Sequence, residues 1–462
     1  PLKRGVSEER GVLLSKVGTT GRGHFIPSNK FLKVVTKYLE TVCQRHLYER
    51  NSNEKGMRIL NKIKLIALFV MLVGIVSAQL PYDDFEIVES IPVETTLDNP
   101  DIRNTFDVWL EMISDAQSTI DIEQFYISNK KGEALEPIIR AIEKAADRGV
   151  EVRIVAEEKM SKTYPETLER FSKYKNIQVR LINVFGSKGG VQHSKYFIVD
   201  RRQVFIGSQN FDWRALDHIH ELGLRIRHIP YAKKMTKLFE LDWKQYNAKR
   251  MLPQSPSRKI EWMTVKENER EPVQFFATAS PDENIPSGFM LDLPAIIELI
   301  DNAQKRVYIQ LLSYSPSVRG GAYFAELDDA LRRAAARGVA VRLLCSDWCQ
   351  KRYEMPYLKK LVVLANLNVK LSTIPEWSGG YISFSRVEHC KIMIIDDSLS
   401  WIGSSNWKRN YFYDSRNIAI VVKNTQVNSR LSQVFLKSWD GPYSWKVDPE
   451  REYKPKYFGE KN

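Results

Sequence analysis

Cysteine and histidine are both scarce in this chain of 462 residues, which contains four and seven of them. Cys43 lies near the start, and Cys345, Cys349 and Cys390 are the others. Cysteines spaced in this way form neither a disulfide framework nor a zinc-binding pattern. The glycosylation sequence Asn-x-Ser/Thr is also absent. The chain therefore depends on an ordinary apolar core, for which a hydrophobic content of 43% is sufficient.

A strong excess of charge is absent from most of the chain, although the formal net charge is +13. Residues 1–78 contain 14 Lys/Arg against 5 Asp/Glu, whereas residues 79–462 contain 55 against 51. A basic surface is a common signature of proteins that bind nucleic acids. Because the excess lies in the first 78 residues, the bulk charge does not identify a substrate.

Long apolar runs are also lacking, with one exception that has the layout of a secretory signal peptide. Basic residues follow Met57, residues 65–76 are apolar, and small residues precede Gln79. A membrane span requires about 20 apolar residues, which is more than this run contains. We therefore expect residues 57–78 to be a cleaved signal peptide of a secreted or periplasmic protein, and a type II anchor with a lumenal enzyme is the alternative. With Met57 as the start, residues 1–56 are expected to be a non-native or disordered extension.

The remaining chain contains an internal duplication. In each half an apolar strand precedes a helix that ends in Arg-Gly-Val, at residues 148–150 and 337–339, and glycine there suits a helix C-cap. A strand, a helix and another strand follow each time, which indicates α/β layers with a largely parallel sheet. The expected parts are a first domain at residues 86–252, a Pro/Ser-rich linker at 253–272, a second domain at 273–446 and a charged tail at 447–462.

Each half also contains the same short motif. The two copies are His193-Ser-Lys195 with Asp200 and then Gly207-Ser208-Gln-Asn210, and His389-Cys-Lys391 with Asp396 and then Gly403-Ser404-Ser-Asn406. A single histidine on an apolar strand is usually a core or surface residue. The repetition of the whole string in a duplicated chain argues against that interpretation.

The spacing within the motif has a physical meaning. Residues 196–199 and 392–395 are strand-like, and side chains alternate along a strand, so the His and Lys of each motif point the same way. An ammonium attracts a phosphate and stabilises charge on its oxygens, while an imidazole can attack phosphorus or carry a proton. Asp200 and Asp396 have the opposite parity and lie at the strand end, so we expect them to support either the structure or the residues around the site rather than to attack the substrate.

The doubled pattern HxK(x)4D followed by GSxN resembles that of the phospholipase D superfamily. The chain looks closest to the lysosomal phospholipase-D-like exonucleases of animals and their bacterial relatives. The resemblance covers about residues 86–446, and the matching stretches are residues 87–92, 207–214, 220–223, 403–407, 410–412 and 439–443. It implies two phospholipase-D-like α-β-α sandwich domains, related by a pseudo-two-fold axis, with one shared active site.

The resemblance also implies a mechanism with a phosphohistidine intermediate. By analogy His193 is expected to be the nucleophile and His389 the general acid and base. This order follows a convention of the analogy, and the reverse order is the alternative. No metal and no other cofactor is implied, because the two lysines supply the charge that a cation supplies elsewhere. The residues expected to bind the phosphoryl oxygens are Lys195, Lys391, Asn210, Asn406, Ser208 and Ser404.

Each reactive imidazole requires a partner on its other nitrogen to fix its tautomer. Glu221 lies 28 residues after His193, where the superfamily often has an acidic residue, and the same offset after His389 leads to Asn417, with Asp414 nearby. We expect Glu221 to orient His193 and to make it more nucleophilic. The alternative for Glu221 is an ordinary salt-bridged strand residue.

Aromatic residues are frequent near both motifs. Bases of single strands stack on such side chains, lipid tails pack on them, and many aromatics only support a core. Trp377 and Tyr381, in the loop before the second motif, are the expected contacts for bases or lipid.

Cleavage of phosphodiesters is therefore the predicted activity. The resemblance favours single-stranded nucleic acid cut from an end, and phospholipid hydrolysis or head-group transfer at a membrane surface is the alternative. A non-catalytic binding module is a different class, and the intact His, Lys and Asn residues of both motifs argue against it. A membrane-anchored structural protein requires that the apolar run be retained. No obligate protein partner is indicated.

Overall fold

The computed structural model describes residues 83–254, 256, 259–267, 270–318 and 321–459. The expectations for residues 1–56 and 57–78 lie outside these ranges. Within the described ranges, no helix has the length and apolarity needed to cross a membrane.

The first half is built on a mixed sheet with the strand order β2-β1-β10-β8-β7-β3-β5-β6. Its strands are β1 (Phe85–Ser90), β2 (Arg103–Asn104), β3 (Thr119–Gln124), β5 (Glu151–Glu157), β6 (Ile177–Ile182), β7 (Tyr196–Val199), β8 (Gln203–Gly207) and β10 (Ile219–Arg227). The short strands β4 (Ile127–Ser128) and β9 (Phe211–Asp212) pair with each other. The helices are α4 (Thr105–Ser114), α5 (Leu135–Asp147), α6 (Glu158–Ser161), α7 (Glu166–Phe171), η1 (Val184–Lys188), α8 (Trp213–Asp217) and α9 (Ile229–Lys244).

The second half repeats this plan, with the strand order β11-β12-β22-β20-β19-β14-β16-β17-β23. Its strands are β11 (Met263–Val265), β12 (Val273–Ser280), β13 (Met290–Leu291), β14 (Arg306–Leu311), β15 (Tyr314–Ser315), β16 (Ala340–Ser346), β17 (Leu367–Ser372), β18 (Val387–Glu388), β19 (Ile392–Ile395), β20 (Leu399–Gly403), β21 (Trp407–Lys408), β22 (Asn417–Lys423) and β23 (Ser444–Lys446). The helices are η2 (Asp282–Asn284), α10 (Asp292–Asn302), α11 (Ala325–Ala336), η3 (Asp347–Cys349), α12 (Met355–Val362), α13 (Arg409–Tyr413) and α14 (Thr425–Asp440).

The sheets are parallel in one part, which corrects the expectation of a largely parallel sheet. β3, β5 and β6 run parallel to one another, whereas β7, β8, β10 and β1 are added antiparallel. A turn at residues 200–202 joins β7 to β8, and a link this short connects antiparallel neighbours. The predicted glycine caps are confirmed, because Gly149 and Gly338 have φ angles of 96° and 90°.

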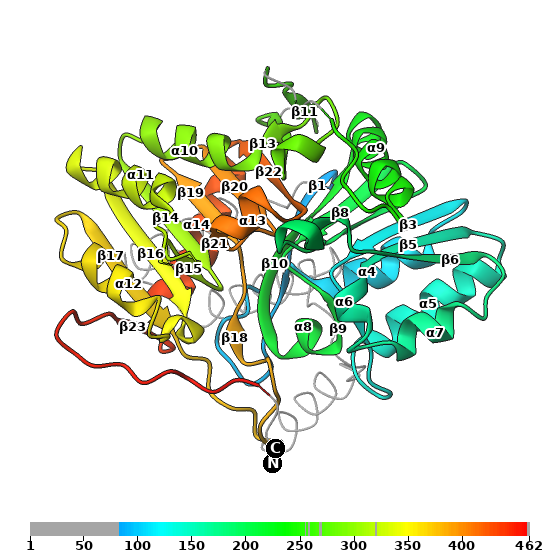
Figure 1. The fold of residues 1–462 in the computed structure, drawn as a ribbon, viewed down its shortest axis with the longest axis horizontal. Helices are drawn as coiled ribbons and strands as arrows, with labels where there is room; N and C mark the ends of the chain where they lie inside the picture. The colour runs from blue at the N-terminus through cyan, green and yellow to red at the C-terminus, as the bar shows by residue number, and fades with distance from the viewer. Residues whose placement is uncertain (1–82, 255, 257–258, 268–269, 319–320, 460–462) are drawn as a thin grey trace, which may run out of the picture. The chain divides into compact units, whose positions relative to one another are not determined.

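Helices cover the outer sheet faces, and one core joins the two halves. α4 and α5 pack on the first sheet through residues such as Trp109 and Ile138, and α10 and α11 pack on the second through residues such as Leu331. A third cluster combines Phe239 of α9 and Phe435 of α14 with strands of both sheets. In Figure 1, β10 and β18 lie where the two halves meet. The shared core fixes the position of one half against the other.

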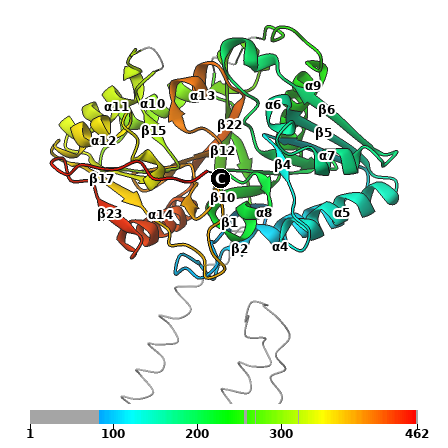
Figure 2. The ribbon, with the colours of Figure 1, turned by 60° about the horizontal axis from the view of Figure 1, so that its bottom comes forward.

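The described part of the expected charged tail packs against the second half. Figure 2 shows this dark red segment running along the second half toward the middle of the view. Phe458 stacks on Trp348 with ring centroids 4.1 Å apart, and its carbonyl accepts a hydrogen bond of 2.7 Å from the Phe384 N–H. The Tyr381 hydroxyl donates to the Gly459 carbonyl at 2.6 Å. The tail thereby holds the outer side of the loop at residues 373–386.

Candidate active site

Strand pairing across the halves brings the two motifs together. β18 runs parallel to β10, with Glu388 opposite His220, and Gln192 forms an isolated parallel bridge with Arg416. The N–H of His389 donates to the His220 carbonyl, and the N–H of His193 donates to the Arg416 carbonyl, both at 2.9 Å. The backbone of each motif histidine is therefore bonded to the opposite half.

Each imidazole also takes its side-chain partner from the opposite half. Nδ1 of His389 lies 2.7 Å from Oε2 of Glu221, and Nδ1 of His193 lies 3.0 Å from Oδ1 of Asn417. The expected pairing of Glu221 with His193 is therefore wrong. The physical reason is the crossed backbone pairing, which places the start of β10 beside His389 and the start of β22 beside His193.

The amide orientation of Asn417 fixes the tautomer of His193. The Asn417 Nδ2 donates to the Tyr411 carbonyl at 2.7 Å, and the Ser404 hydroxyl donates to the Asn417 Oδ1 at 3.1 Å. The oxygen therefore faces His193, whose Nδ1 must carry the hydrogen. This tautomer leaves a lone pair on Nε2 of His193.

The two lysines are arranged alike. Nζ of Lys195 donates to the carbonyl of His193 at 2.7 Å, and Nζ of Lys391 donates to the carbonyl of His389 at 2.6 Å. Both side chains are fully buried. Burial and the charge of Lys391 hold the pKa of Lys195 well below its usual value, and burial lowers the pKa of Lys391 to about 8. Each ammonium retains further N–H groups for the oxygens of a phosphate.

Burial and the lysine charges also act on the other titratable groups. They hold the pKa of His193 and of His389 well below the usual value. Burial raises the pKa of Glu221 well above its usual value, although Lys391 and Lys195 oppose this effect. Oε2 of Glu221 and Nδ1 of His389 are 2.7 Å apart, so one hydrogen must lie between them and the pair shares it. When an anion binds beside the lysines, its negative charge offsets theirs and raises the pKa of the two histidines, so that an imidazolium is stabilised.

The motif asparagines and serines occupy different places. Oδ1 of Asn210 and Oδ1 of Asn406 are buried without a hydrogen-bond partner. An amide oxygen can only accept a hydrogen bond, so the group that could bind a phosphoryl oxygen is Nδ2, and the expected phosphate contact of both asparagines stays a prediction. The Ser208 hydroxyl instead donates to the Leu222 carbonyl at 3.2 Å, and the one hydrogen of the Ser404 hydroxyl is shared between Oδ1 of Asn417 at 3.1 Å and the Ile418 carbonyl at 3.3 Å. This corrects the expected phosphate contact of the two serines, because their hydroxyls hold β10 and β22 in place.

Asp200 and Asp396 lie at the far ends of β7 and β19 from the histidines. Asp396 accepts backbone N–H bonds from Gln304, Lys305 and Arg306 at 3.0, 2.7 and 3.0 Å. Asp200 accepts the equivalent bonds from residues 117–119. Burial raises the pKa of Asp200, but these hydrogen bonds outweigh it and lower the pKa overall. The two aspartates cap the starts of β3 and β14, which is the structural one of the two expected roles.

Asp396→Ala should lower stability without removing catalytic groups. We expect the free energy of unfolding to fall by about 1–3 kcal/mol, because three N–H groups lose a charged acceptor. Urea denaturation measures the change. Asp397→Ala is the matched control, because its ion pair with Lys305 is exposed and solvent screens it, so that its removal should leave the free energy of unfolding nearly unchanged. Equal stabilities of the two variants would contradict the capping role.

Aromatic rings flank the histidines. Phe125 and Tyr411 lie 5.0 and 4.9 Å from the His193 ring, and Trp377 is half-buried and lies 5.1 Å from His218. Tyr381, which was expected to contact bases or lipid, is bonded to the tail. The sequence did not single out Phe125, and its position directly after the expected strand at residues 119–124 was the available signal.

A buried group of three residues could offer ligands to a metal ion. His220, Glu388 and Cys390 place one donor atom each within 4.8 Å of one another. Nδ1 of His220 lies 2.8 Å from Oε2 of Glu388, and the Cys390 thiol donates to the His220 carbonyl at 3.6 Å. These hydrogen bonds account for the group as a polar network beside the active site. Cys390 belongs to the apolar core.

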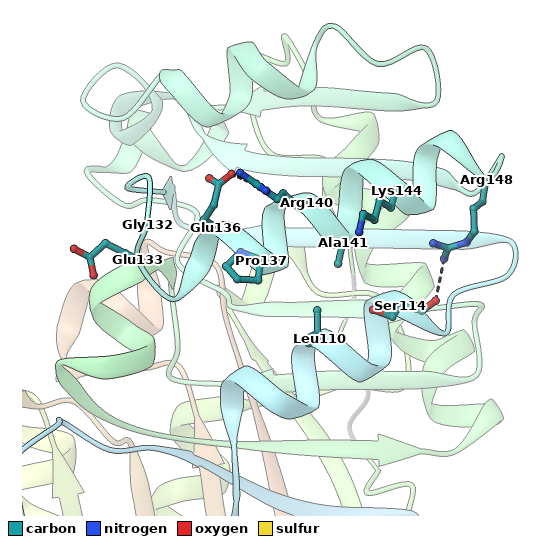
Figure 3. A pocket seen from close by; sticks show the side chains of 10 residues that line it. All are labelled: Leu110, Ser114, Gly132, Glu133, Glu136, Pro137, Arg140, Ala141, Lys144 and Arg148. Carbon is teal, nitrogen blue, oxygen red and sulfur yellow. Dashed lines mark hydrogen bonds and ion pairs between the residues drawn. The ribbon is translucent and has the colours of Figure 1, made fainter. Parts of the chain in front are cut away.

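A groove of about 420 Å³ lies between α4 and α5, away from the motifs (Figure 3). Arg140 forms an ion pair with Glu136 at 2.8 Å, and Arg148 donates to the Ser114 carbonyl at 3.0 Å. No motif residue lines this groove, so it is separate from the site between the halves.

Comparison with known proteins decides the family. The family model described as "Cardiolipin synthase, PLD-like domain" matches twice, at residues 109–243 and 296–439. The chain belongs to the phospholipase D superfamily. It is a hydrolase of the phosphodiesterase class, and the predicted internal duplication and α/β fold are confirmed.

Relatives are similar to this superfamily member over most of its length. The "5'-3' exonuclease PLD3" of Macaca fascicularis is 32% identical over 402 residues, which are 79% of this chain and 82% of that protein. "Phospholipase D Z" of Dictyostelium discoideum is 29% identical, over 78% of this chain and 90% of that protein. The phosphatidylserine synthase of Haemophilus influenzae Rd KW20 has a TM-score of 0.53 at 13% identity, covering 74% of this chain and 85% of that chain. This last similarity concerns the fold alone.

Proposed function

We propose that this phosphodiesterase cleaves single-stranded nucleic acid from an end, through a phosphohistidine intermediate. The observation that carries the mechanism is the unequal pairing of two imidazoles, one with an amide and one with a carboxylate, beside two buried lysines. The nucleic-acid substrate is supported by the relatives named as exonucleases. Aromatic rings beside His193 and His218 offer surfaces for bases.

In the first step, His193 is the nucleophile. Its neutral tautomer presents the Nε2 lone pair to phosphorus, while Lys195 and Lys391 stabilise charge on the non-bridging oxygens. The bond from phosphorus to the leaving oxygen breaks, and His389 gives that oxygen a proton. The Glu221 carboxylate favours the imidazolium that this transfer requires.

In the second step, the roles of His389 change. The neutral imidazole takes a proton from water, the resulting hydroxide attacks phosphorus, and the bond between phosphorus and His193 breaks. The assignment of His193 as nucleophile agrees with the expectation from the sequence, but the physical reason differs. An amide partner keeps His193 unprotonated, whereas a carboxylate partner prepares His389 as the acid.

Phospholipids are the second candidate substrate, favoured by the relative named "Phospholipase D Z". The test uses purified residues 79–462 with a 5′-hydroxyl single-stranded oligonucleotide and, in parallel, phosphatidylcholine vesicles. Stepwise shortening of the oligonucleotide, absent with His193→Ala, supports the nuclease. Release of choline without shortening would overturn the nucleic-acid substrate and leave the phosphodiesterase mechanism in place.

Activity should survive chelation of divalent metals. The two lysines supply positive charge at the phosphate, so the proposed steps require no cation. The measurement is kcat after dialysis against EDTA, with and without added Mg²⁺ or Zn²⁺. A loss that added metal restores would contradict this mechanism.

We also propose that the enzyme is exported, as the pattern of residues 57–78 predicts. Expression of the chain from Met57 in a secreting host, followed by N-terminal sequencing, tests this. An N-terminus near Gln79 supports a cleaved signal peptide. An uncleaved chain that stays in the membrane fraction supports the type II anchor instead.

A further inference from the structure

Arg386 carries a buried charge that the proposed mechanism does not use. The residue lies three positions before His389, and 4% of it is exposed. Nε donates to the Pro375 carbonyl at 2.7 Å and Nη1 to the Val93 carbonyl at 2.9 Å, while Nη2 is buried without a partner. A buried charge is normally paired with an opposite charge, because its desolvation is costly.

A counter-charge for Arg386 is missing from the described part of the chain, where no carboxylate forms an ion pair with it. Glu94 is the acidic group whose charge acts on Arg386, but it is exposed. Its carboxylate accepts hydrogen bonds from Ser378 N–H at 2.9 Å and from the Ser378 hydroxyl at 2.5 Å. Burial lowers the pKa of the guanidinium, as a charge without a close partner requires.

His218 lies beside Arg386, directly before β10, and two indole rings lie beside His218. The Arg386 N–H donates to the His218 carbonyl at 2.8 Å. The His218 ring lies 5.6 Å from Trp213 and 5.1 Å from Trp377, and its Nδ1 is buried without a partner. Burial, helped by Arg386, lowers the pKa of His218 to about 4, so the ring is neutral at pH 7. Both indoles are half-buried and keep part of their surface open.

The group lies beside the catalytic pair. β10 and β18 run parallel, with Ile219 opposite Val387 and His220 opposite Glu388. Three residues of extended chain span at most about 10 Å, so the backbone of Arg386 lies within that distance of the backbone of His389. A strand whose scissile phosphate lies at His389 can reach Arg386 with its neighbouring nucleotide.

We propose that Arg386, His218 and Trp377 form a subsite for the nucleotide next to the scissile phosphate. The guanidinium pairs with the neighbouring phosphodiester anion. His218 donates or accepts one hydrogen bond with the same nucleotide, and the Trp377 indole stacks on its base. Because Nη2 is covered in this structure, the loop at residues 373–386 shifts when the strand binds. This inference rests on the nuclease function proposed above.

The test uses single-stranded trinucleotides that differ in the second linkage only. In one substrate this linkage is a phosphodiester, and in the other it is a methylphosphonate, which has the same shape and no charge. For the wild-type enzyme, kcat/KM at the first linkage should fall roughly 10- to 100-fold with the methylphosphonate. With the phosphodiester substrate, Arg386→Gln should have a kcat/KM as low as that of the wild type with the methylphosphonate. This variant should have the same kcat/KM with both substrates, whereas Arg386→Lys should retain much of the wild-type preference for the phosphodiester.

Trp377 is tested with an abasic second nucleotide. An abasic nucleotide cannot stack on the indole, so wild-type kcat/KM should be roughly 5- to 50-fold lower with it than with the ordinary substrate. The Trp377→Ala enzyme should have the same kcat/KM with the abasic and the ordinary substrate. Trp262→Ala is the matched control, because Trp262 is 40% exposed and packs on Phe276 at 4.9 Å, in the segment between the domains. It should behave as the wild type does.

The outcomes separate the subsite from the nuclease function. If the wild-type enzyme shortens the ordinary and the methylphosphonate substrates equally fast, the nuclease function stands and the subsite is wrong. If it shortens neither while it releases choline from vesicles, both proposals fall. The comparison in the wild-type enzyme requires no substitution, so a variant that fails to fold does not affect it.

Discussion

His193→Ala and His389→Ala should each lower kcat on an oligonucleotide by about 10⁴-fold or more, because nucleophile and proton carrier act as one unit. Both side chains are almost fully buried, with 5% and 8% of the residue exposed. Each forms one side-chain hydrogen bond through Nδ1, so the fold should tolerate alanine. Steady-state rates and thermal unfolding of the purified variants measure both effects.

His228→Ala is the matched control for these variants. Nδ1 of His228 accepts a hydrogen bond from the Tyr231 N–H at the start of α9, at the opposite end of β10 from Glu221. We expect its kcat to stay near that of the wild type. An active His193→Ala enzyme, or an inactive His228→Ala enzyme of native stability, would contradict the assigned site.

Glu221→Gln should lower kcat by roughly 10²- to 10³-fold, because His389 loses the carboxylate that favours its protonated form. Loss of this carboxylate lowers the pKa of His389, so the decline of kcat at high pH moves to lower pH. Asn417→Asp should act in the opposite sense on the other histidine. A carboxylate raises the pKa of His193, so the decline of the rate at low pH moves to higher pH, by about one unit.

The pH–rate profiles of these two variants test the unequal pairing of the imidazoles. Burial and the lysines hold the pKa of His193 well below the usual value, so the wild-type nucleophile should stay unprotonated into mildly acidic solution. Glu261→Gln, at a surface ion pair with Lys234, is the control and should keep the wild-type profile. Identical profiles for Glu221→Gln and Asn417→Asp would contradict the assignment of roles.

The sequence predicted the elements that carry the motifs, because their patterns are local. Residues 196–199 and 392–395 are strands as predicted, and the helices that precede the two Arg-Gly-Val sequences end where their glycines indicated. Strand parity also predicted that His and Lys act together. Such signals depend on neighbours within a few residues and require no knowledge of the second half.

The pairing of the imidazoles could not be predicted, because it depends on contacts between distant strands. The offset of 28 residues identified Glu221 and Asn417 but carried no information about the half in which each partner lies. The pairing of β10 with β18 decides it. The serines of the GSxN sequences were misassigned for a similar reason, because the sequence does not show which strand lies beside a hydroxyl.

The aspartates show the limit of parity as evidence. Parity placed Asp200 and Asp396 away from the histidines, but the groups they bond to are backbone N–H groups of residues 117–119 and 304–306. Those residues precede β3 and β14, which become neighbours of β7 and β19 only in the folded sheet.

The central claim is that His193 forms the covalent intermediate, and His389→Ala tests it with a nucleoside p-nitrophenyl phosphodiester. p-Nitrophenolate leaves without a proton, so the first step should proceed, while the second step lacks its base. We predict a burst of one p-nitrophenolate per protein and, by peptide mapping, a phosphoryl adduct on His193. An adduct on His389 in the His193→Ala enzyme, with none on His193 in the His389→Ala enzyme, would contradict the account.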